Sequence, residues 1–78
     1  MNKIKVSVEL NYNSNLIFTI KDNPKSIYIS HQESVWRFWQ MIKDYNSTIP
    51  VLTSLGVAFE ANIPEELFGV IKKFDGIR

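Results

Sequence analysis

Apolar and polar residues alternate without a break near the start of the chain. Polar residues separate five apolar positions of one parity, Ile4, Val6, Val8, Leu10 and Tyr12. A period of two is typical of a strand with one buried face. The alternation returns over 16–21 and again, briefly, over 27–29, with turn-forming residues at 13–15 and 22–25 between the runs. The pattern therefore predicts an antiparallel three-stranded meander over residues 3–29.

The spacing of apolar residues changes after Ser30. Apolar side chains now recur every three or four positions, at Val35, Phe38, Trp39, Ile42 and Tyr45. Ser30 and Glu33 have the spacing of a capping box, in which each side chain meets a backbone N–H at the start of a helix. The sequence predicts a helix over 31–45 that covers the apolar face of the meander.

Residues 46–62 fit two structures. Pro50 suits the first turn of a helix, Gly56 suits the left-handed position after one, and Ser47 or Thr48 could cap it. These signals favour a short helix over 49–55, followed by a strand over 57–61. The alternative is a bent hairpin, because one parity also holds the apolar residues Ile49, Val51, Leu55, Val57 and Phe59.

A last helix is predicted over 64–75. Pro64 followed by two acidic residues is typical of a helix start, and Gly76 of a helix end. Leu67, Val70, Ile71 and Phe74 form its apolar stripe. Strands first and helices later predict an α+β fold, a two-layer sandwich, in one small globular domain over 1–78.

Composition removes several classes of function. The 78 residues contain no cysteine, which excludes disulfides, thiolate nucleophiles and cysteine-based metal sites. Nine Lys and Arg against eight Asp and Glu leave a net charge of +1, so no strong field draws the chain to nucleic acid or an anionic membrane. The apolar runs are too short for a secretory signal or a membrane span. We therefore expect a cytoplasmic protein that does not enter a membrane.

Candidates for catalysis are few. His31 is the only histidine and the one natural general base, but no catalytic motif surrounds it. The carboxylates do not form an oxygen-ligand loop, and the adjacent Glu65 and Glu66 would point about 100° apart on a helix. We expect no enzymatic activity, no cofactor and no metal site.

A basic sheet face is one alternative function. Four lysines fall on or near the outward parity of the predicted meander, and Tyr28 shares that face; they are Lys3, Lys5, Lys21 and Lys25. Basic residues around an exposed aromatic ring can bind single-stranded nucleic acid. Glu9 interrupts this face and the net charge is small, so weak nucleic-acid binding is only the alternative hypothesis.

Protein binding is the leading hypothesis. Trp36 and Phe68 each stand one position after an apolar stripe, where a large ring is either the border of a wide core or an exposed anchor. With Tyr28, Arg37 and Ile17 they are the predicted partner-binding residues. The sequence thus predicts a non-enzymatic protein-interaction module that acts by steric occlusion or by self-association as a homodimer. A small inhibitor or regulator encoded by a mobile element would have this size.

Overall fold

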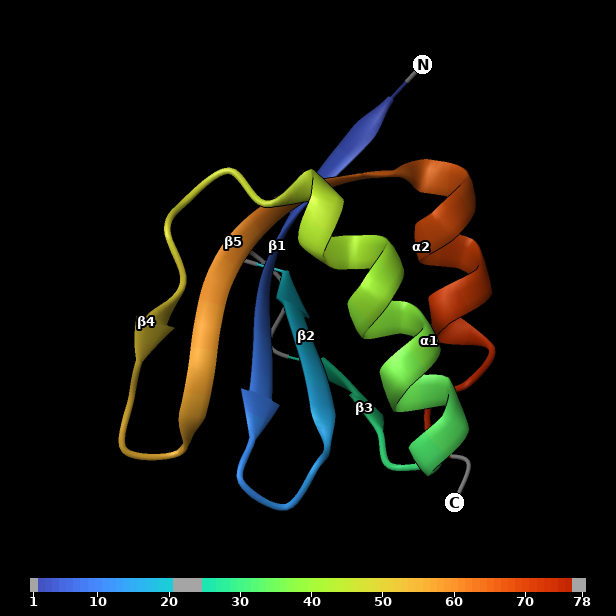
Figure 1. The fold of residues 1–78 in the computed structure, drawn as a ribbon. Helices are drawn as coiled ribbons and strands as arrows, with labels where there is room; N and C mark the ends of the chain where they lie inside the picture. The colour runs from blue at the N-terminus through green and yellow to red at the C-terminus, as the bar shows by residue number, and fades with distance from the viewer. Residues whose placement is uncertain (1, 21–24, 77–78) are drawn as a thin grey trace.

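Five antiparallel strands form one sheet, and two helices pack on one of its faces in the computed structural model of the chain (Figure 1). The structure describes residues 2–20 and 25–76. The strands lie in the order β3-β2-β1-β5-β4. Their bounds are Lys3–Asn11 (β1), Leu16–Ile20 (β2), Ser26–Ile29 (β3), Val51–Leu52 (β4) and Gly56–Pro64 (β5). The helices are Gln32–Ile42 (α1), extended by a 3-10 turn over Lys43–Tyr45, and Glu65–Lys72 (α2).

The predicted meander is confirmed, and its register explains the buried face. Val8 lies opposite Phe18 of β2 on one side and Phe59 of β5 on the other, so apolar residues of all three strands face the same way. β5 pairs with β1 from Lys3 to Asn11, a longer strand than the predicted 57–61. The helices cover this face with Val35, Phe38, Ile42, Phe68 and Ile71. The predicted two-layer α+β sandwich is therefore present.

Both long helices form where the apolar stripes predict them. Phe38 of α1 meets Phe74 edge-on with 5.1 Å between ring centroids, and Trp39 meets Phe59 at 5.5 Å. The N-cap of α1 is His31, one residue after the predicted Ser30. The His31 Nδ1 atom lies 3.0 Å from the Ser34 hydroxyl, a contact between two side chains. The His31 side chain does not bond to a backbone N–H of the first turn, so the observed N-cap differs from the predicted capping box.

The short helix predicted over 49–55 is wrong. Val51 and Leu52 form the edge strand β4, which pairs with Ala58 and Val57 of β5, and the chain turns over residues 53–56. Helix and hairpin compete here because Pro and Gly mark the boundaries of both. The hairpin satisfies the outer backbone groups of β5, which a helix would leave without a strand partner. The structure contains the bent hairpin, which was the alternative that the shared parity of the apolar residues indicated.

Gly56 has a different role from the one predicted. It lies in β5 opposite Asn11, and a Cβ atom added to it would stand 2.1 Å from the carbonyl oxygen of Leu10. Close approach of the β1 backbone, not a left-handed conformation, requires a glycine at this position. Among the described residues, Ser14 in the β1–β2 turn, with φ 62°, and Gly76 after α2, with φ 77°, are left-handed.

Candidate functional site

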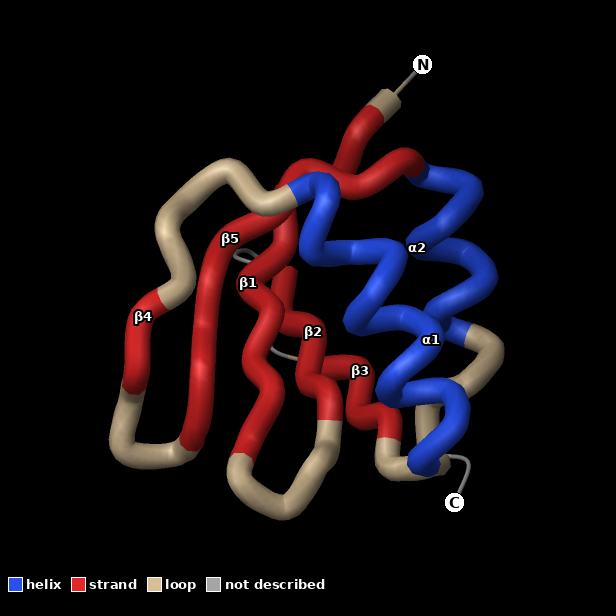
Figure 2. Tube along the Cα trace, viewed as in Figure 1, coloured by secondary structure: helices blue, strands red, loops and turns tan. Residues whose placement is uncertain are grey.

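The segment that leads into β4 follows β5 and then leaves it. The N–H of Ser47 donates to the carbonyl oxygen of Glu60 at 2.7 Å, and the Thr48 hydroxyl accepts from the N–H of Glu60 at 2.8 Å. Asn46 pairs with Ala61 and Val51 with Ala58, so residues 47–50 oppose only residues 59 and 60 of β5. The surplus residues bow away from the sheet at Ile49 and Pro50, as the tan loop before β4 shows in Figure 2.

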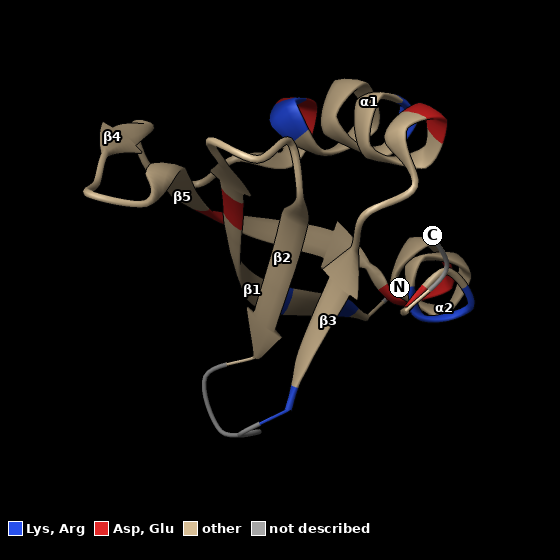
Figure 3. Cartoon of the chain, turned by 90° about the horizontal axis from the view of Figure 1, so that it is seen from below, with Lys and Arg blue, Asp and Glu red and all other residues tan. Residues whose placement is uncertain are grey.

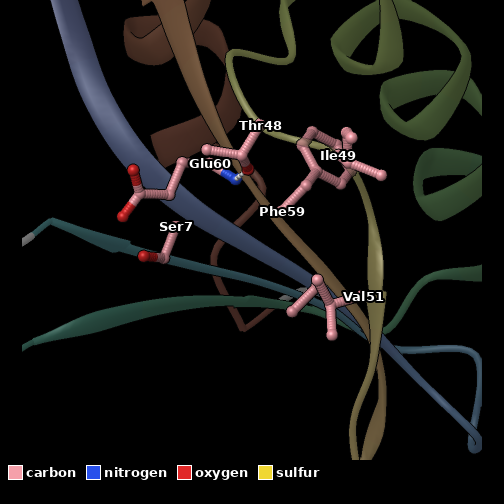
Figure 4. A pocket seen from close by; sticks show the side chains of 7 residues that line it. Ser7, Thr48, Ile49, Val51, Phe59 and Glu60 are labelled. Atoms are coloured by element: carbon pink, nitrogen blue, oxygen red, sulfur yellow. Dashed lines mark hydrogen bonds between the residues drawn. The ribbon is translucent and has the colours of Figure 1, made fainter.

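A shallow cavity lies where the segment bows outward. Its volume is about 390 Å³, and its walls come from the 48–51 segment, from β5 and from Ser7 of β1. Figure 4 shows Ile49 and Val51 on one side of it, with Ser7 and Glu60 on the other. Ile49, Val51, Ala58 and Phe59 make most of the lining apolar, and Ser7, Thr48 and Glu60 add polar groups to it. The apolar part of the cavity offers a docking place for an apolar side chain.

The hairpin that follows β4 is held against the β1–β2 turn. The Thr53 hydroxyl accepts from the N–H groups of Leu55, at 3.2 Å, and Gly56, at 3.1 Å. The N–H of Tyr12 donates to the carbonyl oxygen of Leu55 at 3.0 Å, and the Tyr12 hydroxyl donates to the carbonyl oxygen of Thr53 at 3.3 Å. These bonds place the Tyr12 ring beside the hairpin, next to Leu55.

Large apolar side chains concentrate at this edge of the sheet. The structure describes nine such side chains as exposed, and five of them lie on β4, on its flanking turns and on the adjacent β1–β2 turn. Each of the five exposes between 59% and 84% of its surface. We call them the edge surface: Tyr12, Ile49, Val51, Leu52 and Leu55. Val51 and Leu52 are consecutive strand residues and point to opposite faces of the sheet, so the edge surface wraps around the edge. Exposed apolar side chains gathered at one edge of a small domain are typical of a protein-binding site.

No charge interrupts the edge surface. Residues 45–59 contain no Asp, Glu, Lys or Arg, and the β4 hairpin is drawn without blue or red in Figure 3. Figures 1 and 3 also show β4 at the end of the sheet that lies away from the helices. The edge surface is therefore apolar, uncharged and left uncovered by the described part of the chain.

The predicted partner-binding residues do not form one surface. Phe68 is only 7% exposed and packs in the core, so the expectation that it lies on the surface is wrong. Trp36, 48% exposed, and Arg37, also exposed, lie on α1. Tyr28 and Ile17 are register partners on the face of the sheet that the helices leave open. The remaining four therefore lie in two places, one on each side of the sandwich.

The predicted helix over 49–55 hides the edge surface from sequence analysis. In a short helix, Ile49, Leu52 and Leu55 would share one side and face the core. The shared parity of Ile49, Val51 and Leu55 was the one signal in the sequence that pointed to an extended edge.

Two of the four lysines of the alternative hypothesis lie on the open face of the sheet. Lys3 and Lys5 lie on β1, and the ammonium group of Lys5 is 3.5 Å from a carboxylate oxygen of Glu60 across the β1–β5 pair. Lys25 lies just before β3, and Lys21 lies outside the described residues. An acidic partner beside Lys5 lowers the positive potential that this face would offer to phosphate groups.

His31 makes a structural contact at the start of α1. Its partner Ser34 is buried in the first turn of α1, so the hydroxyl is shielded from a substrate. Within residues 2–20 and 25–76, no three His, Asp or Glu side chains come together as a metal-ligand set. The contact between His31 and Ser34 therefore supports the start of the helix.

Comparisons with known proteins do not assign the chain to a family. No family model matches it, and neither a curated protein nor a solved structure resembles it significantly. Neither α1 nor α2, nor any other helix among the described residues, has the length and apolarity needed to cross a membrane.

Proposed function

We propose that this chain is a non-enzymatic protein-interaction module that binds through the edge surface. One observation carries the proposal: four large apolar side chains stand exposed on residues 45–59, a stretch that has no charged residue, and the exposed Tyr12 lies against the same hairpin. Leaving them in water is costly, and a partner that covers them gains roughly 25 cal/mol for each Å² of apolar surface removed from water. The protein would act sterically in the cytoplasm, as an inhibitor or regulator that occludes or bridges a partner's surface.

The shape of the edge surface supports this mode of action. Ile49 and Val51 border the shallow cavity, while Leu52 and Leu55 project from the strand and its turn. A partner could insert an apolar side chain into the cavity and lay an extended segment along β4. Hot spots of protein interfaces have this combination of apolar anchors and a neighbouring pocket.

The experiment compares capture by two variants that carry the same new charge in different places. Tagged wild-type chain, Leu52→Lys and Met41→Lys are used as bait in an extract of the source cells. Met41 is exposed on α1, in the helix layer and not in the sheet that contains β4. We expect Leu52→Lys to lose the captured protein, at least about a tenfold decrease, because a buried lysine at an apolar hot spot is strongly unfavourable.

Met41→Lys should capture as much as the wild-type chain. The bound proteins, including untagged copies of this chain added to the extract, are identified by mass spectrometry. Equal capture by all three baits would show that the edge surface is not the binding site.

A further inference from the structure

The two edge strands of the sheet, β3 and β4, differ in whether another segment bonds to their outer backbone groups. At β3, the N–H of Tyr28 donates to a carboxylate oxygen of Asp75 at 2.9 Å, and its carbonyl oxygen accepts from the N–H of Gly76 at 3.0 Å. The segment after α2 therefore covers that edge. β4 is the last strand at the opposite edge, and the described part of the chain places no further strand beyond it. Within the described residues, the β4 edge is therefore open to another strand, whereas the β3 edge is occupied at Tyr28.

The register of the hairpin shows which backbone groups of β4 point outward. The N–H of Thr53 donates to the carbonyl oxygen of Gly56 at 2.6 Å, so these two residues form a hydrogen-bonded pair. Hydrogen-bonded and non-hydrogen-bonded pairs alternate along antiparallel strands. Leu52, which lies opposite Val57, is therefore in a non-hydrogen-bonded pair and directs its N–H and carbonyl oxygen away from β5.

The absence of charged residues at this edge is compatible with pairing to a second copy of the same chain. Exposed edge strands normally carry charges, often lysine, which stop identical copies from pairing. Residues 45–59 carry none, and the whole chain has a net charge of only +1. Two copies that meet at β4 thus bring no like charges together, and their long-range repulsion is weak.

The apolar area also matches what a dimer needs. Burying one large apolar side chain removes roughly 100 Å² from water, so five of them offer on the order of 400–500 Å² per chain. A standard interface takes about 800 Å² from each partner, of which a little more than half is apolar. The edge surface is large enough to supply the apolar part of such an interface.

We infer that β4 pairs antiparallel with β4 of a second copy around a twofold axis, joining two sheets into one. Leu52 lies at the axis, and its N–H and carbonyl oxygen bond to the carbonyl oxygen and N–H of Leu52 in the second copy. The two Leu52 side chains then lie side by side on one face, because residues that are directly opposite point the same way. This inference rests on the proposed function and names the partner that the edge surface fits.

The first experiment measures the mass of the purified chain in solution by sedimentation velocity from about 1 µM to 1 mM, a range that spans weak and moderate dimers. We expect the mass to rise from 9.1 kDa to twice that value as concentration increases. Leu52→Lys should raise the dissociation constant at least about 30-fold, as loss of a hot spot does. Met41→Lys, which adds the same charge on α1, should dimerise like the wild-type chain.

The second experiment tests the register directly. Leu52→Lys and Leu52→Glu should each be monomeric, because the twofold axis places like charges opposite each other. Mixed in equal amounts, the two variants should form a heterodimer, since opposite charges then face each other across the axis. Circular dichroism of each variant establishes that its fold is intact, which is expected because Leu52 is exposed in the single chain.

Three results would overturn the second-copy inference. They are a wild-type chain that stays at 9.1 kDa throughout, a dimer that Leu52→Lys does not weaken, and a charge-swapped mixture that stays monomeric. A monomeric chain that captures another protein through Leu52 would leave the proposed function standing, with a different partner. A monomer whose captures do not depend on Leu52 would remove both.

Discussion

Gly56→Ala is expected to lower the free energy of unfolding by about 3 kcal/mol, the upper range for an overpacked site. The added Cβ would stand 2.1 Å from the carbonyl oxygen of Leu10 and 2.6 Å from the Cα atom of Asn11. Both atoms belong to the β1 backbone, so no side-chain rotation can relieve the overlap. β1 and β5 must move apart where β5 begins, which breaks their pairing at the end that supports the β4 hairpin.

The measurement is urea denaturation followed by circular dichroism. A domain of this size has a stability of roughly 5 kcal/mol, so the midpoint should fall by more than half. Gly69→Ala is the matched control, because Gly69 lies within α2 with nothing within 4 Å of its added Cβ. Alanine there should stabilise the helix by about 0.5–1 kcal/mol. Equal midpoints for wild type and Gly56→Ala would show that β1 and β5 are not in close contact at this residue.

Phe68→Ala is expected to lower the free energy of unfolding by about 3–5 kcal/mol, the range for a phenylalanine removed from a core. The ring is 7% exposed and belongs to the same buried cluster as Val6, Phe18 and Ile71. Its removal leaves a cavity between α2 and the sheet that small shifts of a short helix cannot fill. The side chain of Lys72, whose ammonium group lies 5.8 Å from the ring centroid, also loses its contact.

Trp36→Ala is the control for the aromatic positions. Trp36 stands in the same relation to its helical stripe as Phe68 does, but it is 48% exposed. Its substitution should cost less than about 1 kcal/mol, because much of the ring is already in water. Thermal unfolding of the two variants gives the comparison. If Trp36→Ala costs as much as Phe68→Ala, then the outer side of α1 is covered by another part of the molecule or by a partner.

The two aromatic positions show why sequence patterns could not assign the surface. Trp36 and Phe68 each follow an apolar residue by one position, and helical spacing treats them alike. Burial depends on how far the sheet extends beneath each helix and on what packs beside it. Phe68 reaches the core cluster, whereas Trp36 lies on the outer side of α1. No local pattern contains that information.

The candidate site depends on one further choice that the local sequence left open. Between Asn46 and Gly56 the residues satisfy the boundary signals of a short helix and the parity of a strand. Pairing with β5 decides between them, since β5 has an outer row of backbone groups that an adjacent strand can satisfy. The exposed apolar residues at the edge follow from that choice. Reading the segment as a helix conceals them.

Local patterns of apolar residues were enough to predict the three-stranded meander, the two helices and the α+β layering, because a period of two fits a strand and a period of 3.6 fits a helix. The sequence also determined the absence of thiol chemistry and the weak net charge. Three further features became visible in the folded chain: residues 51–52 form an edge strand, Phe68 belongs to the core, and Tyr12 lies beside residues more than 35 positions away in sequence. These outcomes depend on contacts between distant segments, and a local pattern records only which side of an element is apolar, not what will cover it.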